Sequence, residues 1–311
     1  MRLGALALSL AVLLAFQAIA IVTGATLSGT SINATGVGDA VVCPGGTNPD
    51  PNVLFCDNFD AGGWALADYS DHHVGTNADF GVVASQGQGG TSALRALWAI
   101  GDDEAGNLQV TFGRNPIGLQ MFNSTEDFTE IYWREFIKTG ADWATDAGTY
   151  KLSRAHVFAV ADYSQAAVAQ VWPDGNLFLI TDPASGTDTN GNVVTTGYND
   201  TNCDPGCLAY EGVTNGSTGI FTSANKETWF CIEAYVKLNN SGANGIQRVW
   251  IDDVLEIEDT TIDFVGDTTP YTDYGINAIY IENFWNTGAP GARTIYHDNL
   301  VISKARIGCD I

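Results

Sequence analysis

The chain beyond residue 52 reads as a succession of short β-strand segments, and this texture constrains the fold more than any other feature. Runs of β-branched and aromatic residues, such as 131–138 and 155–160, alternate with clusters of Gly, Asn, Asp and Pro. Residues 168–180 and 248–257 each contain an Asp-rich turn between two such runs, which predicts two hairpins. No segment has a sustained helical period. Evenly spaced short strands without helices predict an all-β fold, a sandwich or jelly roll of two antiparallel sheets.

The N-terminal residues differ from the rest of the chain. Arg2 precedes an almost unbroken apolar run over residues 3–22, and small residues follow. This pattern predicts a signal peptide over residues 1–25 and a secreted or cell-surface location. The run is also long enough for an uncleaved membrane anchor. Residues 26–52 are rich in Gly, Thr, Ser, Asn and Pro and are predicted to be a leader segment.

Residues 53–311 are predicted to form a single jelly-roll domain. The least regular stretch, residues 182–228, is interpreted as a long loop insertion, and such loops often carry function. A disulfide between Cys203 and Cys207 is predicted to close part of this loop. Six cysteines in an exported chain indicate disulfides, although spacing alone leaves the pairing open. Cys231 and Cys309 could tie a central strand to the C-terminal segment.

The charge balance excludes two classes of partner. The chain has 36 acidic and 13 basic residues, a formal net charge of −23. A protein with this charge repels nucleic acid and anionic membrane surfaces, so neither is an expected partner. The excess of Asp also supplies hard oxygen ligands of the kind that calcium prefers.

Strand alternation sorts the polar side chains by face, because successive residues of a strand point to opposite sides of the sheet. In residues 231–238 the alternate residues are apolar and predicted to face the core, so the intervening polar residues share the opposite face. The same reasoning applies to residues 279–284 and 154–158. If these strands are neighbours, one sheet face collects Arg134, Arg154, His156, Glu233, Tyr235, Lys237, Tyr280 and Glu282.

Several segments carry a resemblance to a known superfamily. They are residues 53–60 (VLFCDNFD), 229–239 (WFCIEAYVKLN), 249–253 (VWIDD) and 276–309, the last including IENFWN and YHDNLVIS. In this order they resemble the polysaccharide-lyase-like branch of the concanavalin-like jelly rolls, which includes alginate, glucuronan and heparin lyases. The sequence lacks the Arg-rich strand motif, the Gln-Ile-His triplet and the Tyr-x-Lys-x-Gly-x-Tyr run of well-marked alginate lyases.

The resemblance implies two facing antiparallel sheets, one of them curved into a cleft that holds an extended sugar chain. It also implies a structural calcium ion near the chain ends, held by acidic residues of the first and last strands. The residues that match this expectation are Asp57, Asp60 and Asp298. Hard oxygen ligands from both ends of the chain would close the sandwich.

The predicted polar face suits a β-elimination on a uronate-containing polysaccharide. A cation neutralises the uronate carboxylate and acidifies the proton at C5, a base removes that proton, and an acid protonates the leaving oxygen. We predict Arg134 or Lys237 as the neutralising cation, His156 as the base, and Tyr235 or Tyr280 as the acid. The predicted substrate-binding residues are Arg154, Glu233, Glu282 and Trp285.

Other interpretations stay open at the level of sequence. Glu233 and Glu282 could form the carboxylate pair of a glycoside hydrolase, although the Glu-x-Asp-x-Glu motif of laminarinase-like jelly rolls is absent. A non-catalytic carbohydrate-binding or adhesion domain, or a structural surface protein, would share the same fold. The polar residues could also be cross-strand ion pairs, and His156 a structural histidine.

Overall fold

The computed structural model describes residues 42–43, 46–47, 50–60, 69–74, 80–118, 123, 125–144, 150–175, 177–198, 208–265 and 275–310. The predicted signal peptide, most of the predicted leader, and Cys203 and Cys207 lie outside these residues. Within the described part of the chain, no helix has the length and apolar character to cross a membrane.

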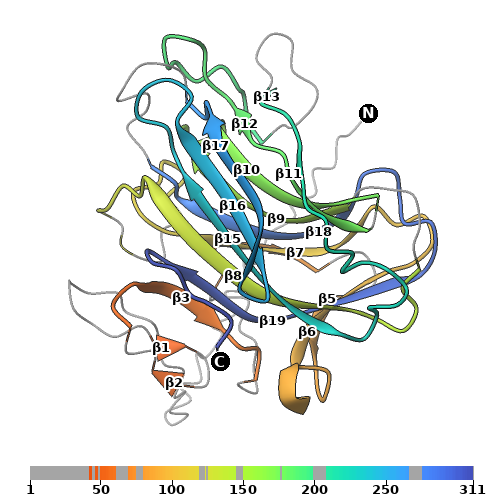
Figure 1. The fold of residues 1–311 in the computed structure, drawn as a ribbon. Coiled ribbons are helices and arrows are strands. Elements are labelled where there is room, and N and C mark those ends of the chain that lie inside the picture. The colour runs from red at the N-terminus through yellow and green to blue at the C-terminus, as the bar shows by residue number, and fades with distance from the viewer. Residues whose placement is uncertain are drawn as a thin grey trace, which may run out of the picture. The chain divides into compact units, whose positions relative to one another are not determined.

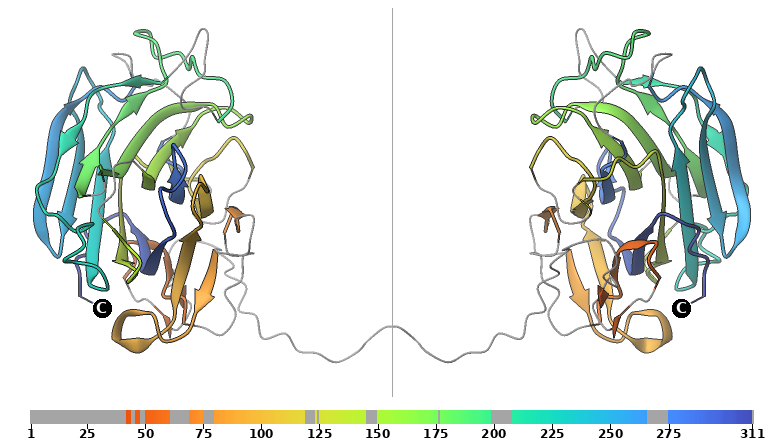
Figure 2. Two further views of the ribbon diagram at one scale, coloured as in Figure 1. Left: turned by 90° about the vertical axis from the view of Figure 1, so that its right-hand side faces the viewer. Right: turned by 90° about the vertical axis from the view of Figure 1, so that its left-hand side faces the viewer.

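The described strands form two large antiparallel sheets, as the sequence pattern predicted, and a small pair of β1 (Val42–Cys43) and β2 (Gly46–Thr47). Figures 1 and 2 show the large sheets as two layers. The predicted all-β jelly-roll sandwich is therefore confirmed.

The first large sheet has nine strands, with β10, β9, β18 and β7 as adjacent central neighbours (Figure 1). Its strands are β4 (Asp71–His73), β7 (Glu104–Thr111), β9 (Tyr150–Phe158), β10 (Gln165–Asp174), β11 (Phe178–Thr181), β12 (Ala184–Ser185), β13 (Ala209–Tyr210), β14 (Thr214–Asn215) and β18 (Ala278–Trp285). The short strands β12, β13 and β14 come from the predicted loop insertion and extend one edge of this sheet.

The second large sheet has eight strands in the order β17-β16-β15-β8-β19-β6-β5, with β3 beside β19. Its strands are β3 (Val53–Asp57), β5 (Phe80–Val83), β6 (Ala93–Trp98), β8 (Glu130–Thr139), β15 (Trp229–Lys237), β16 (Gly245–Ile251), β17 (Val254–Ile262) and β19 (Arg293–Ser303). Both predicted hairpins are present, as β10–β11 and β16–β17. Asp252 and Asp253 turn the second one with φ of 49° and 67°, the left-handed values that two-residue hairpin turns favour.

The core lies between the two sheets. Trp133 Nε1 on β8 donates to Ser153 Oγ on β9 over 3.1 Å, and His297 Nε2 on β19 contacts Asn283 Oδ1 on β18 at 2.9 Å. These pairs identify which side of each strand faces inward. A group of packed rings fills one end of the core, made of Trp98, Trp143, Tyr150, Phe221 and Trp285.

The core position of Trp285 corrects one prediction. Trp285 was predicted as a sugar-stacking residue, but its side chain is 1% exposed and stacks on Tyr150 at a centroid distance of 5.3 Å. It alternates with Phe284, which points to the other side of β18 and is half-buried.

Candidate functional site

The outer face of the nine-stranded sheet carries a row of polar side chains. Ser153 faces the other sheet through its bond with Trp133, so the next residue, Arg154, points outward. Directly paired residues of neighbouring strands share a face. The register therefore places four side chains in one outward row across β10, β9, β18 and β7, namely Gln170, Arg154, Tyr280 and Gln109.

His156 lies beside this row on the same face. It is two residues from Arg154 on β9 and directly opposite Ala278 on β18. Its ring stacks on Phe158 at a centroid distance of 4.8 Å, and its centroid lies 5.8 Å from that of Tyr198 and 6.1 Å from that of Tyr280. The structure thus brings together the predicted residues Arg154, His156 and Tyr280, within the distances that one intervening substrate group can bridge.

Arg154 and Glu282 form a buried ion pair under Tyr198. The Arg154 guanidinium contacts Glu282 Oε1, and the Tyr198 hydroxyl donates to the same oxygen over 3.2 Å. The Arg154 guanidinium carbon lies 5.2 Å from the centroid of the Tyr198 ring. Arg154 is fully buried, whereas Tyr198 is 41% exposed. Tyr198 therefore forms the outer cover of the pair.

Tyr280 places a phenol hydroxyl in this row. Its hydroxyl donates to Asn107 Oδ1 on β7 over 3.1 Å. Burial, followed by the nearby Glu282 carboxylate, raises the pKa of the Tyr280 phenol well above its ordinary value. The phenol is therefore protonated throughout the neutral range.

Four predicted site residues lie elsewhere. Glu233, Tyr235 and Lys237 share one face, as strand alternation predicted, and the register places Arg134 on it too, but that face is the outer side of the eight-stranded sheet. The prediction that they join Arg154 and His156 is wrong, because β15 pairs with β8 and β16 and not with β9 or β18. Glu233 and Glu282 are in different sheets for the same reason, which removes the geometric basis of the hydrolase interpretation.

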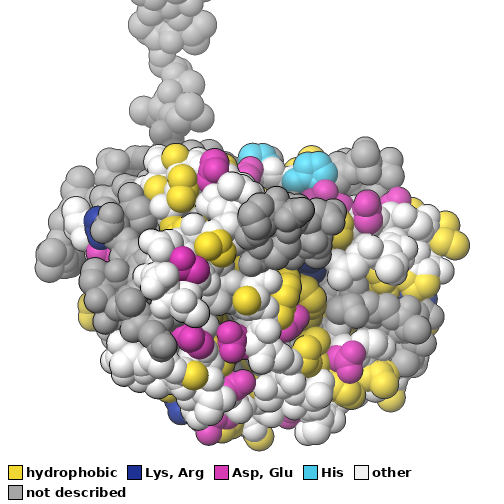
Figure 3. All heavy atoms as spheres, turned by 90° about the horizontal axis from the view of Figure 1, so that it is seen from above, with side chains coloured by type: hydrophobic (Ala, Val, Ile, Leu, Met, Phe, Trp, Pro, Cys, Tyr) yellow, Lys and Arg dark blue, Asp and Glu magenta, His cyan; other side chains and the backbone are white. Residues whose placement is uncertain are grey.

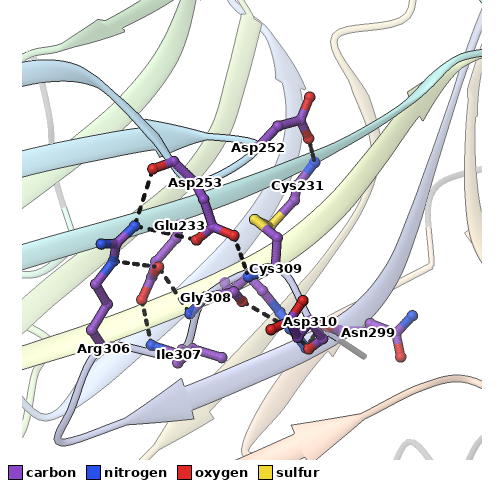
Figure 4. Close-up of a disulfide and its surroundings, with 11 residues drawn as sticks. Cys231, Glu233, Asp252, Asp253, Asn299, Arg306, Ile307, Gly308, Cys309 and Asp310 are labelled. Atoms are coloured by element: carbon purple, nitrogen blue, oxygen red, sulfur yellow. Dashed lines mark hydrogen bonds and ion pairs between the residues drawn. A yellow bond between two sulfur atoms is a disulfide. The ribbon is translucent and has the colours of Figure 1, made fainter.

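Glu233 holds the C-terminal segment, as Figure 4 shows, and Arg134 also contacts this segment. The carboxylate of Glu233 accepts the backbone N–H of Ile307 over 2.6 Å and that of Gly308 over 3.2 Å. Arg134 donates to the carbonyl oxygens of Gly308 and Asp310 over 3.1 and 3.3 Å. These contacts give both charged side chains structural partners.

The disulfides are partly described. Cys231 on β15 is bonded to Cys309, so the predicted tie between a central strand and the C-terminal segment is present (Figure 4). Cys56 is also disulfide-bonded.

Tyr235 and Lys237 lie farther along the same face. The Tyr235 hydroxyl donates to Glu130 Oε2 over 2.6 Å, and its ring lies 4.4 Å from that of Tyr132. Lys237 is directly paired with Glu130 on β8 and with Ile246 on β16, and is half-buried.

The predicted calcium ligands Asp57, Asp60 and Asp298 lie near one another, close to the C-terminal end of β3. Asp298 accepts the backbone N–H of Gln88 over 2.8 Å, and burial, with contributions from Asp60 and Asp57, raises the pKa of Asp298 to about 6. Three carboxylates suit calcium chemically. In the arrangement seen, Asp57 accepts the Tyr69 hydroxyl, and the described residues contain no group of three or more Asp, Glu, His or Cys side chains placed to hold a metal ion. Calcium binding therefore stays a prediction.

Tyr198, Gln109 and Gln170 were not predicted from the sequence. Tyr198 belongs to the irregular insertion, and the only signal was that long insertions often carry function. The two glutamines alternate with apolar residues in β7 and β10, but no sequence pattern relates them to Arg154.

Acidic side chains dominate the visible charge of the molecule. Figure 3 shows Asp and Glu side chains at many places on the face seen from above, and Lys and Arg at few. Exposed cations are therefore few on this face of the molecule.

Comparison with known proteins identifies the fold. No protein-family model and no curated protein matches the chain. Among solved structures, it is similar to an endo-β-1,4-glucuronan lyase from the fungus Trichoderma reesei, with 14% identity, a TM-score of 0.51, and coverage of 76% of this chain and 91% of that one. It is similar to an alginate lyase from a Chlorella virus, with 11% identity, a TM-score of 0.52, and coverage of 77% and 94%. A third similar structure is an alginate lyase mutant in complex with an alginate trisaccharide, with 12% identity, a TM-score of 0.50, and coverage of 82% and 99%. The chain thus has the fold of these polysaccharide lyases.

Proposed function

We propose that this protein is a secreted polysaccharide lyase that cleaves a uronate-containing polysaccharide by β-elimination. The observation that carries the proposal is the convergence of Arg154, His156, Tyr280 and Tyr198 on the outer face of the nine-stranded sheet. A cation, a nitrogen base and a protonated phenol are the three groups that this elimination needs. The fold shared with solved glucuronan and alginate lyases supports the same reaction class.

Arg154 takes the role of neutralising cation that was predicted for Arg134 or Lys237. A guanidinium has five N–H donors in a planar fork, the geometry that binds a carboxylate best, and Glu282 shows that this side of Arg154 accepts one. Charge neutralisation at the carboxylate acidifies the C5 proton and stabilises the negative charge that develops in the transition state. Glu282 holds the guanidinium in position from one side.

His156 and Tyr280 divide the proton transfers. His156 removes the C5 proton, and the electron pair of the C5–H bond becomes the C4–C5 double bond as the bond from C4 to the leaving oxygen breaks. Tyr280, a phenol that is protonated at neutral pH, gives its proton to that oxygen. The products are a new chain end with a hydroxyl group and an unsaturated uronate.

Tyr198 controls access in this proposal. Its ring covers the fully buried Arg154, and its hydroxyl binds Glu282. A uronate reaches Arg154 when the Tyr198 side chain moves outward. Tyr198 then lies against the bound sugar, where aromatic side chains commonly stack.

The test is the ultraviolet absorbance of the unsaturated uronate, measured with alginate, glucuronan, pectate and heparin-like substrates. His156→Ala and Tyr280→Phe are each expected to lower kcat by about 10²–10⁴-fold, the usual contribution of a positioned acid or base. Tyr235→Phe is the matched control, because it removes the same hydroxyl from the other sheet, and it should keep the activity. A flat absorbance with all substrates, together with measurable binding of any of them, would instead identify a non-catalytic carbohydrate-binding domain.

A calcium ion at Asp57, Asp60 and Asp298 is a further part of the proposal. These carboxylates come from β3, from the residues just after it, and from β19, which are paired at this point of the sheet. The ion would support the fold and take no part in the elimination, because the site lies in the eight-stranded sheet.

A further inference from the structure

A second group of side chains lies on the outer face of the nine-stranded sheet, near the end of β9. Asn283 faces the core through His297, so Phe284 points outward, and Lys151 on β9 is its directly paired neighbour. The Lys151 ammonium nitrogen lies 5.0 Å from the centroid of the Phe284 ring and 6.0 Å from that of Trp172 on β10. Adjacent strands β10, β9 and β18 thus contribute one residue each.

This group is accessible, in contrast to the row beside it. Lys151, Trp172 and Phe284 are half-buried, whereas Arg154 and His156 are almost completely buried. A polymer that reaches Arg154 along β9 therefore has solvent-accessible side chains to contact at this end. The pairing of β9 with β18 is irregular between Ser153 and Lys151, and Tyr150 and Trp285 beyond it stack in the core, so Lys151 lies on the outer face with Arg154 although the two are three residues apart. Three residues of a strand span about 10 Å, which is longer than a pyranose ring, so the two cations would contact different sugar units.

Buried donors without protein partners point to a ligand at this face. The indole N–H of Trp172, both amide atoms of Gln170 and the amide nitrogen of Gln109 have no hydrogen-bond partner among the described residues. Both glutamines are at least 98% buried, since Gln109 is 2% and Gln170 is 0% exposed. Buried polar groups in native proteins are nearly always hydrogen-bonded, so these groups suit a partner rich in hydroxyl groups.

We propose that Lys151, Trp172 and Phe284 form a subsite for a second, negatively charged sugar unit of the polymer bound at Arg154. The aromatic rings offer apolar faces for a pyranose, and the ammonium group pairs with its carboxylate. The inference rests on the proposed lyase function and specifies its substrate class. The preferred polymer carries acidic groups on neighbouring units, in contrast to one in which uronates are widely separated by neutral sugars.

The alternative is that Lys151 has a purely structural role, which includes its packing on two rings. Such a cation–π contact is worth about 0.5–1 kcal/mol at exposed sites and needs no ligand. Binding measurements separate the two cases, because a packing role affects folding and a subsite affects sugar affinity.

The experiment is calorimetric titration of the full chain carrying His156→Ala, which prevents turnover. The probes are oligoglucuronates and oligoguluronates, with neutral cello-oligosaccharides of the same length for comparison. Lys151→Gln is expected to weaken binding of a charged probe by about tenfold or more, the loss of one charge-assisted interaction, and to leave neutral probes unchanged. Trp172→Phe is expected to weaken both kinds of probe, and thermal melting checks that each variant is folded. Lys304→Gln, a lysine on the C-terminal segment, should behave as the parent.

The outcomes distinguish this subsite from the lyase proposal. If Arg154→Gln weakens binding of the charged probes and Lys151→Gln does not, the subsite is overturned and the proposed function stands. If Lys151→Gln weakens binding and no elimination product forms with any uronate polymer, the subsite stands and the lyase proposal falls. Equal loss of charged and neutral probes in Lys151→Gln would also overturn the subsite, because the interaction would then not be with a carboxylate.

Discussion

Replacement of Glu233 by Gln tests whether the polar face of the eight-stranded sheet is structural. Glu233 is fully buried, and each of its carboxylate oxygens accepts one backbone N–H of the C-terminal segment, from Ile307 and from Gly308. Its charge also favours the charged form of Arg134, which is directly paired with it on β8 and is 4% exposed, and it forms an ion pair with Arg306 at 3.4 Å. A glutamine keeps the shape of the side chain but replaces one acceptor oxygen by an N–H₂ donor.

The expected loss follows from these contacts. One backbone N–H faces a donor instead of an acceptor, which costs about 1–3 kcal/mol, and the buried Arg134 charge loses its counter-charge. Breaking a buried pair in this way costs about 3–5 kcal/mol in total. For a domain of this size, each kcal/mol lowers the melting temperature by about 2–4 °C, so Glu233→Gln should melt about 6–20 °C lower.

The assay is thermal and urea unfolding, with lyase activity measured on the same samples below the transition. Glu258→Gln is the matched control, since its carboxylate is 43% exposed and pairs with Arg248 at the surface. That change should cost less than about 1 kcal/mol. The reasoning is refuted if Glu233→Gln unfolds at the parent temperature while its lyase activity is abolished, because that pattern would assign Glu233 to the chemistry.

Two further predictions concern ions. If calcium binds at Asp57, Asp60 and Asp298, calcium at one hundred times its Kd should raise the free energy of unfolding by about 2.7 kcal/mol relative to a sample with chelator. Asp298→Asn should remove this difference. Identical melting curves with calcium and with chelator would contradict the site. The protein and the proposed substrate are both anionic and repel each other. Raising the salt concentration from about 0.01 to 0.1 M shortens the Debye length from about 30 to 10 Å, which screens this repulsion, so kcat/KM should increase. A steady decrease of kcat/KM over this range would show that attraction at Arg154 and Lys151 outweighs the repulsion.

The sequence was sufficient for local geometry. Alternation of side chains correctly grouped Arg154 with His156, Tyr280 with Glu282, and Glu233 with its neighbours on β15, because the period of two is a property of any strand. It also gave the strand-rich architecture and both hairpins, since turn chemistry is encoded in a few adjacent residues.

The same reasoning could not predict which strands are neighbours in a sheet. β15 lies between β8 and β16, and β18 lies between β9 and β7, so two similar polar faces belong to different sheets. Pairing of strands far apart in the chain depends on the fit of whole sheets, which no local pattern specifies. Tyr198 was missed for a related reason, because its position over Arg154 is set by the path of an irregular segment.

The positions of the basic residues favour an acidic polymer as the substrate of the proposed site. The chain has 13 basic residues, and several described ones brace the eight-stranded sheet and its C-terminal segment, among them Arg134, Arg248 and Arg306. Arg154 and Lys151 instead lie on one strand, on the outer face of the other sheet. In a molecule with a formal net charge of −23, a polyanion is repelled except where local cations offset that field. The two cations therefore favour a polymer aligned along β9, with one acidic unit at Lys151 and the reacting unit between Arg154 and His156.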